Sequence, residues 1–486
     1  MLATSLAGAW RAHPSTRAGV LIDSCDYYRA FYETAKLARR SILLLGWQFD
    51  SDVQLVRGDE VPVGVDPESL QLLPFLEALC AARPELEVRL LAWDHSVVFA
   101  MERELLQKLW FNLRTGSRFH FEFDDTVPPY GAHHQKVAVL DGQIAFLGSS
   151  DICQDRWDTS AHACDDPLRI GRSGKPCKPY HEVQAVLAGD AARSLLDLFV
   201  ERWADAKGEA LDAATLVGPG ETPLPVPLAT FDMPRADVGL YRELPHQLDR
   251  SPVREVKALL VGAIAGAERL IYIETQYLTS QAIADALISR MRDAGRPKLD
   301  IAVVLPQKPE ALKEELAIGG SQAKVLADLS GVALETGHAL GLYNVAVKRD
   351  GEDLFIYIHS KLMVVDDLVL TIGSTNLSNR SMSLDSEVNV AWSTTESGGE
   401  LAGAIGALRR RLLTEHIGYP VDSSVLACSG LVGRLDAIVR RGGSRLRAHD
   451  LPVAEASALL EAAQELASAY VDPLHAPDSD RDAISQ

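Results

Sequence analysis

The chain alternates short, strongly apolar segments with longer amphipathic ones, which is the pattern of an α/β protein. Residues 41–49 (SILLLGWQF) and 270–278 (LIYIETQYL) are apolar stretches of strand length, and each contains a Gln beside aromatic residues near its end. Residues 86–94 and 299–307 are again apolar and follow stretches of helical character. Nearly continuous apolar runs of this length are typical of strands buried on both faces. We therefore expect a matched pair of buried strands in each of two regions of the chain.

Two other segments have the alternation of β-hairpins, and their polar residues match. Residues 133–151 are HHQKVAVLDGQIAFLGSSD, and residues 359–376 are HSKLMVVDDLVLTIGSTN. Both contain H-x-K-x4-D, and in both a Gly-Ser pair begins seven residues after the aspartate. The shared residues are His134, Lys136, Asp141, Gly148 and Ser149 in the first segment, and His359, Lys361, Asp366, Gly373 and Ser374 in the second. Two such copies indicate an internal duplication.

Hairpin geometry predicts where these polar side chains point. Residues i and i+2 of a strand share a face, so the His and the Lys of each motif project together. A two-residue turn at the aspartate sets His359 opposite Ser374, and the same counting sets His134 opposite Ser149. The aspartates then lie at the far end of each hairpin, where we expect a structural role.

The duplication extends beyond the hairpins. From Gln48 to His134 is 86 residues, and from Gln276 to His359 is 83. We expect an α/β fold of two homologous α/β/α halves, with mixed sheets packed about a pseudo-twofold axis and the active site at the seam. The expected organisation is a first half at 1–206, a Pro/Gly-rich connection at 207–238, a second half at 239–419, and a helical extension with a polar tail at 420–486.

Helix signals add detail to this organisation. We expect helices near 190–206, 251–268, 430–441 and 453–470. Ser251 followed by Pro252 predicts the start of the second of these, because Ser is a good N-cap and Pro suits the first helical position.

Bulk properties exclude some classes of protein. The net charge of −19 weighs against a nucleic-acid partner, because binding to phosphates needs a basic face. The sequence has no apolar run long enough to span a bilayer and no secretory signal at its start, which favours a cytoplasmic location or a non-classical export route. Cys164 and Cys177 share a polar segment with His162 and could pair in an exported protein, but reduced thiols are favoured. Their spacing fits no compact zinc motif, so we expect no metal and no cofactor.

The paired histidines suggest chemistry at phosphorus. Breaking a phosphodiester through a covalent intermediate needs one group to attack and another to protonate the leaving alcohol, and two imidazoles can fill both roles. Lys136 and Lys361 would surround the phosphate oxygens, together with Ser149, Ser374 and Asn376, and would oppose the charge of the transition state.

Each histidine also needs its second ring nitrogen held, usually by a carboxylate. Glu387, in DSEVNVAW, and Glu182, in YHEVQAVL, follow the two hairpins on apolar strands in matched contexts. The alternative is an edge-strand ion pair, but the matched placement favours the orienting role.

On these motifs the chain resembles the phospholipase D superfamily. IYIETQY, HSKLMVVDD, IGSTNLSNRSM and DSEVNV are similar to the branch that contains the eukaryotic phosphatidylcholine-hydrolysing enzymes and their bacterial relatives. The similarity covers roughly residues 20–415. It implies a metal-independent hydrolase that passes through a phosphohistidine, with His134 as nucleophile and His359 as acid and then base. It also implies transphosphatidylation to primary alcohols.

Two departures from the family pattern bear on these expectations. Asp151 stands where the second motif has Asn376, so we expect the first half to bind phosphate less directly. The amino-terminal lipid-binding modules of the eukaryotic enzymes are not seen, so we expect peripheral membrane contact through the loops 152–181 and 308–345. We also expect a monomer.

Three other functions use related sequences. A phosphatidyltransferase of the cardiolipin or phosphatidylserine synthase type would use the same site with an alcohol acceptor. A nuclease is disfavoured by the acidic chain, and a catalytically inactive lipid-binding relative is disfavoured by two intact motifs.

Overall fold

The computed structural model describes residues 6–94, 111, 116–128, 131–172, 174–220, 223–246, 250–309, 312–450 and 472–473. The first half contains β1 (Arg11–Ile22), α1 (Asp23–Ala35), β2 (Ser41–Gly46), the 3-10 turns Gly58–Glu60 and Pro67–Leu70, α2 (Leu72–Ala82), β3 (Glu87–Trp93), β4 (Phe119–Asp124), β5 (Val137–Leu140), β6 (Ile144–Gly148), β7 (Tyr180–His181), β8 (Val183–Ala188) and α4 (Asp190–Lys207). These bounds confirm the strands expected near 41–49 and 86–94 and the helix expected near 190–206.

The second half repeats this order of elements. It contains β9 (Phe231–Leu244), β10 (Val253–Arg254), α5 (Glu255–Gly266), β11 (Leu270–Glu274), α6 (Gln281–Arg292), β12 (Asp300–Val304), α7 (Leu312–Thr336), β13 (Ala339–Arg349), β14 (Glu352–Phe355), β15 (Tyr357–Ile358), β16 (Leu362–Val365), β17 (Val369–Gly373), β18 (Glu387–Ser393) and α8 (Glu400–Ile417). The 3-10 turn Ser423–Leu426, α9 (Leu431–Arg441) and β19 (Leu446–Ala448) follow.

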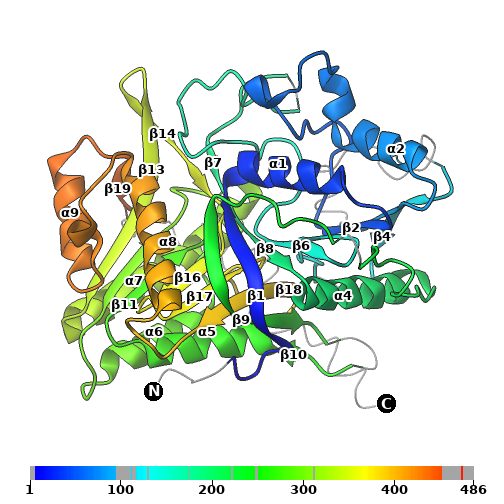
Figure 1. Ribbon diagram of the computed structural model, residues 1–486. Coiled ribbons are helices and arrows are strands. Elements are labelled where there is room, and N and C mark those ends of the chain that lie inside the picture. The colour runs from blue at the N-terminus through cyan, green and yellow to red at the C-terminus, as the bar shows by residue number, and fades with distance from the viewer. Residues whose placement is uncertain are drawn as a thin grey trace.

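The two sheets have the same topology, which confirms the predicted duplication. In hydrogen-bonding order the first sheet is β4-β3-β2-β5-β6-β8-β1, and the second is β13-β12-β11-β16-β17-β18-β9. In each sheet the first three strands are parallel and the rest antiparallel, so both sheets are mixed. Strands β1 and β9 pair antiparallel with each other and run side by side through the middle of the molecule, as Figure 1 shows.

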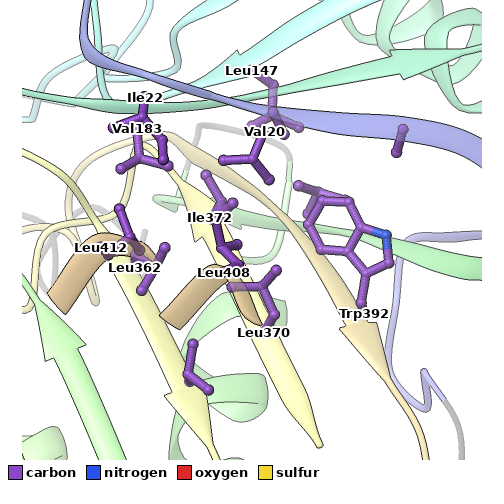
Figure 2. Packing of buried hydrophobic residues seen from close by; sticks show 14 of the residues in the cluster. Val20, Ile22, Leu147, Val183, Leu362, Leu370, Ile372, Trp392, Leu408 and Leu412 are labelled. Atoms are coloured by element: carbon purple, nitrogen blue, oxygen red, sulfur yellow. The ribbon is translucent and has the colours of Figure 1, made fainter. Parts of the chain in front are cut away.

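The largest hydrophobic cluster lies between the two halves. Figure 2 shows Val20, Ile22, Leu147 and Val183 of the first half facing Leu362, Ile372, Leu408 and Trp392 of the second. The outer faces bury separate clusters, against α1 and α2 in one half and against α5, α6 and α7 in the other. A shared core of this kind makes the two halves one cooperative unit, because separating them would expose their largest apolar surface.

The hairpin register differs from the expectation by one residue. Both turn residues of the second hairpin, Asp366 and Asp367, have positive φ, and the Leu368 N–H closes the turn on the carbonyl of Val365. The ladder, however, pairs Val365 with Val369, and in the first hairpin Leu140 pairs with Ile144. One residue after each turn therefore stays outside the ladder, as in a β-bulge, and the predicted pairing of each histidine opposite a serine was wrong by one position.

Other local expectations also need correction. Strand β9 begins at Phe231, inside the region expected to be an irregular connection, and α7 occupies much of the expected loop 308–345. Helix α5 begins after Arg254 rather than at Ser251. The physical reason is that the Glu243 carboxylate accepts the backbone N–H of Lys257 and so caps the helix from the neighbouring strand. Helix α9 was predicted correctly, and the helix expected at 453–470 lies outside the described residues.

Candidate active site

Two short stretches of parallel β pairing join the two halves at the seam. Strand β15, which precedes the second motif, pairs with β7, which precedes Glu182. The His359 N–H donates to the His181 carbonyl at 2.9 Å, and in the symmetric contact the His134 N–H donates to the Ser386 carbonyl at 2.9 Å. Each motif histidine is therefore placed by the residue just before the glutamate of the opposite half.

Because of this pairing, each motif histidine contacts the glutamate of the opposite half, and we call these contacts the crossed pairs. His134 Nδ1 lies 3.0 Å from both carboxylate oxygens of Glu387, and His359 Nδ1 lies 2.9 Å from Oε1 of Glu182. All four side chains are buried or nearly so. With Nδ1–H donated to a carboxylate, the Nε2 lone pair of each imidazole is left for chemistry. Neither half holds its own histidine, so the pair of halves is the functional unit.

The motif serines contact the glutamates. The Ser374 hydroxyl donates to Oε2 of Glu387 at 2.5 Å, and the Ser149 hydroxyl donates to Oε2 of Glu182. Each serine oxygen also accepts a backbone N–H, from Val388 or Val183, at 3.1 Å. Both hydroxyls are thus engaged in orienting a carboxylate. The sequence had suggested that they contact the substrate phosphate, a role for which these bonds leave less capacity.

The two lysines differ in their partners. Lys361 Nζ donates to the His359 carbonyl at 2.6 Å and to Oε1 of Gln276 at 3.2 Å. Lys136 Nζ likewise donates to the His134 carbonyl, at 3.3 Å, but its second contact is an ion pair with Asp151 at 3.1 Å. The site is therefore asymmetric at the position where the sequence replaces an amide by a carboxylate.

Asp151 and Asn376 occupy corresponding positions in the two motifs, and their contacts differ. Asp151 Oδ1 also accepts the Trp47 N–H at 2.9 Å, so its carboxylate is held away from a free role in phosphate binding. Asn376 is buried, and its side-chain oxygen has no hydrogen-bond partner among the described residues. Of these two side chains, that of Asn376 is the one with a hydrogen-bonding atom available to a ligand.

Burial and like charges set the protonation of the site. Burial lowers the pKa of His134 well below its ordinary value, and the charges of Lys136 and Lys361 lower it further. Burial likewise lowers the pKa of His359, helped by Lys361 and Arg156. Both imidazoles are therefore neutral at neutral pH in the free site, which is the form that can act as a nucleophile.

The same buried environment shifts the pKa of two further groups, Lys361 and Glu387. Burial lowers the pKa of Lys361 well below its usual range, although Glu182 opposes the shift. Burial raises the pKa of Glu387 to about 7. A cation-rich buried site of this kind is relieved when an anion such as a phosphodiester enters it.

The remaining motif residues support the backbone. The Asp141 carboxylate accepts the N–H groups of residues 39, 40 and 41, and the Asp366 carboxylate accepts those of 268, 269 and 270. A Cβ at Gly148 would lie 2.6 Å from the Val183 carbonyl, and one at Gly373 would lie 2.6 Å from the Val388 carbonyl. Gln48, the counterpart of Gln276, is half-buried. The aspartates fix the strand entries, and the glycines let the glutamate-bearing strands approach.

Some residues near the histidines were not expected from the sequence. The Trp47 ring meets the His134 ring edge-on at 5.4 Å, and the Tyr180 ring lies 5.5 Å from that of His359. The Arg156 guanidinium lies over Tyr180 at 4.7 Å. Trp47 precedes the strand-end Gln and Tyr180 precedes the HE dipeptide, so proximity to these motifs was the only available signal. Among the described residues, the groups with metal-ligand geometry include neither His134 nor His359.

Two homologous halves, each giving one histidine and one carboxylate to a cation-rich seam, define a two-histidine phosphodiesterase type of site. Comparisons with known proteins agree. A family model described as "Cardiolipin synthase, PLD-like domain" matches residues 260–405. The chain is therefore similar to the phospholipase D superfamily.

Individual relatives are distant. The chain is 24% identical to phospholipase D alpha 4 of Arabidopsis thaliana, over 82% of this chain and 64% of that one. It is 24% identical to phospholipase D A of Dictyostelium discoideum, over 76% of this chain and 32% of that one. It thus spans less than two thirds of the length of these relatives. The fold is similar to that of phosphatidylserine synthase from Haemophilus influenzae Rd KW20, with a TM-score of 0.53 and 13% identity, covering 88% of this chain and 95% of that one.

The search for a membrane-spanning element gave a negative result for the described part of the chain. None of its helices combines the length and the apolar character needed to cross a bilayer.

Proposed function

We propose that this protein is a phospholipase D. It cleaves the distal phosphodiester bond of a glycerophospholipid and releases phosphatidic acid and the headgroup alcohol. The crossed pairs carry this proposal, because they hold two neutral imidazoles, His134 and His359, at one seam with Nε2 left free. The similarity to the phospholipase D superfamily and to relatives named phospholipase D supports the lipid substrate.

In the first step His134 Nε2 attacks phosphorus, and the bond from phosphorus to the headgroup oxygen breaks. His359 supplies the proton that the departing alkoxide needs. The free site holds His359 neutral, so it must gain that proton when the phosphodiester binds, because the substrate anion raises a histidine pKa that burial and cations lower. Lys136 and Lys361 balance the charge that develops on the phosphoryl oxygens.

In the second step the neutral His359 takes a proton from water, and the hydroxide attacks phosphorus. The phosphorus–nitrogen bond breaks, and phosphatidic acid leaves. Glu387 and Glu182 fix the imidazole tautomers throughout, and the serines hold the glutamates. A primary alcohol that enters in place of water gives a phosphatidyl alcohol, so the same site supports transferase chemistry.

Trapping the intermediate tests the assignment of roles. A phosphodiester with a nitrophenol leaving group needs no acid, so His359→Ala should still be phosphorylated by it, on His134. The adduct should accumulate, because the base that activates water is missing. Mass spectrometry after proteolysis at alkaline pH locates the phosphoryl group. A phosphoryl group on His359 in His134→Ala, with none on His134 in His359→Ala, would reverse the assignment.

The membrane partner is part of the same proposal. We infer peripheral contact through residues 152–181, where Leu168 is exposed, and through α7, where the Leu334 side chain is 86% exposed. Leakage-free vesicles of phosphatidylcholine test this contact by co-sedimentation. Leu168→Ser and Leu334→Ser should each reduce the bound fraction while leaving the rate on a soluble short-chain lipid unchanged. Equal binding by the wild type and both variants would place the contact elsewhere.

A further inference from the structure

A second polar cluster lies buried on the side of Glu182 away from the reacting atoms. Its four members are Asp23, His162, His181 and Glu415, and we name them the buried tetrad. Their exposed fractions are 1%, 1%, 0% and 4% in that order. Asp23 begins α1, His162 follows β6 in the long connection to β7, His181 ends β7, and Glu415 lies in the last turns of α8. The tetrad therefore joins the two halves.

The facing atoms of the tetrad have the separations of a tetrahedral coordination shell. His162 Nε2 lies 3.4 Å from Oε1 of Glu415 and 3.8 Å from Oδ2 of Asp23. His181 Nδ1 lies 3.1 Å from the same Glu415 oxygen and 3.0 Å from Oδ1 of Asp23. Ligands bound at 2.0–2.1 Å around a tetrahedral zinc ion are about 3.4 Å apart. The observed separations, two of which involve different oxygens of Asp23, are close to this value, and the ligand atoms of the tetrad all lie within 4.8 Å of one another.

The outer nitrogens of both histidines are already committed to carboxylates. His162 Nδ1 lies 3.0 Å from Oδ2 of Asp158, and His181 Nε2 lies 3.1 Å from Oε2 of Glu274. Asp158 is held in turn by Arg169, at 2.9 Å. A histidine that ligates a metal usually donates its other N–H to a carboxylate in this way, which leaves the inner nitrogen with its lone pair toward the ion.

The inner atoms lack the partners that such burial requires. Oδ2 of Asp23, Nε2 of His162 and Oε1 of Glu415 each have no hydrogen bond within the described residues, although all three side chains are at least nine-tenths buried. An uncompensated buried polar atom costs on the order of 1–3 kcal/mol. Three such atoms face one centre, and a cation bound there would satisfy all of them.

A buried histidine–aspartate pair next to His134 shows what a compensated version looks like. There the buried Asp124 carboxylate lies 3.1 Å from Nε2 of His133 and also receives the Arg202 guanidinium at 2.9 and 2.6 Å. At the tetrad, no lysine or arginine within the described part of the chain forms an ion pair with Asp23. The arginine contact at the tetrad is a different one: Arg411 pairs with Oε2 of Glu415 at 3.0 Å, and Oε1, which faces the two histidines, is left without a hydrogen bond among the described residues.

We propose that the buried tetrad binds one divalent transition-metal ion of the zinc class, through His162 Nε2, His181 Nδ1 and one oxygen each of Asp23 and Glu415. Two imidazoles and two carboxylates form a donor set that suits such an ion. Its role is positional. His181 precedes Glu182 in the chain and accepts the His359 N–H through its carbonyl, so an ion at the tetrad fixes the pair that orients His359. It contacts no reacting atom, and the phosphoryl chemistry proceeds without it.

Metal analysis of an untagged chain tests this proposal. The protein purified from zinc-supplemented medium should contain about one zinc per chain, and the chelated protein should take up one Co²⁺ with the visible absorption of a tetrahedral site. Asp23→Asn and His162→Gln should each lower the Co²⁺ affinity at least tenfold. Asp124→Asn, which changes the arginine-compensated carboxylate, is the matched control and should keep the wild-type affinity.

Two results would overturn the proposal. One is a folded wild-type chain that neither carries zinc nor binds Co²⁺, which would mean that the tetrad is a purely hydrogen-bonded, protonated network. The other is equal loss in Asp124→Asn. X-ray absorption on the wild-type protein needs no variant. It should show only nitrogen and oxygen ligands, and a sulfur in the shell would assign the ion to a cysteine site instead.

Discussion

The crossed pairs make a prediction about which glutamate serves which histidine. Glu387→Gln removes the carboxylate that holds His134 Nδ1 at 3.0 Å, and Glu182→Gln removes the one that holds His359 Nδ1 at 2.9 Å. A hydrogen bond to a charged group is worth about 1.5–3 kcal/mol, which corresponds to roughly a 10- to 150-fold change in rate. The neutral amide can also donate to Nδ1, which would move the ring proton to Nε2 and remove the nucleophilic lone pair. We therefore expect losses at or above the upper end of this range.

Leaving-group dependence separates the two variants. With a nitrophenyl phosphodiester, formation of the intermediate needs the nucleophile but no acid. Glu387→Gln should therefore suppress the burst of nitrophenol, and Glu182→Gln should retain it while slowing later turnover. On a natural lipid both variants should be slow. The exposed residue Glu33, changed to Gln, is the control for loss of a glutamate as such.

A spectroscopic measurement tests the crossed pairs without any assumption about which histidine attacks phosphorus. Long-range proton–nitrogen spectra report the tautomer of each imidazole, with signals assigned by the His134→Ala and His359→Ala variants. Glu387→Gln should move the ring nitrogens of His134 and leave those of His359 nearly unchanged, and Glu182→Gln should do the reverse. If each glutamine instead perturbs the histidine of its own half, the crossed arrangement is wrong.

Four further predictions follow from the site. His134→Ala and His359→Ala should each lower the rate on natural phospholipids by about 10² or more without unfolding the protein; a variant that keeps a tenth of the wild-type rate in the same assay contradicts the one-site arrangement. Burial raises the pKa of Glu387 to about 7, so kcat/KM should rise with pH through this value as the carboxylate that holds His134 ionises; a pH profile flat from 5 to 8 would exclude this role. The pKa of Glu387 in the folded protein lies above its ordinary value of 4.5. The protonated carboxyl therefore contributes to the free energy of unfolding below about pH 4.5, and this contribution is lost as the pH rises through about 7. Glu387→Gln should remove that part of the pH dependence of unfolding. Ethanol should divert product from phosphatidic acid to phosphatidylethanol, as measured by chromatography; intact hydrolysis with no diversion at high ethanol would point to direct attack by water.

The sequence predicted the local elements of the site because periodicity and turn residues are local signals. The strands near 41–49 and 270–278, both hairpins and the duplication followed from them. The hairpin register did not, because the residue after each turn could either join the ladder or stay outside it, and the two arrangements have the same apolar pattern. The contact of Ser374 could not be predicted for a similar reason. Its place in the hairpin was expected, but its hydrogen bond to Glu387 depends on the distance between β17 and β18.

The crossing itself could not be derived from spacing. Glu387 follows the second motif in the chain, and the sequence supports its placement near His359 as well as near His134. The outcome depends on parallel pairing of β15 with β7, whose two-residue strands carry almost no pattern of their own. The buried tetrad is hidden for the same reason, because Asp23 and Glu415 come from opposite ends of the chain and meet only through the shared core.

Divergence between the halves is what lets a duplicated site perform two roles. A symmetric pair of histidines would have equal basicity, yet attack and proton donation require different acids and bases. The charges of Asp151 and Asp385 raise the pKa of His134, partly offsetting the lysines, and Arg156 adds a further cation beside His359. The charged groups around the two imidazoles therefore differ in sign and number, so the two rings are not equivalent. The replacement of an amide by Asp151 thus makes the two histidines chemically distinct, and the position of the trapped phosphoryl group assigns which of them attacks.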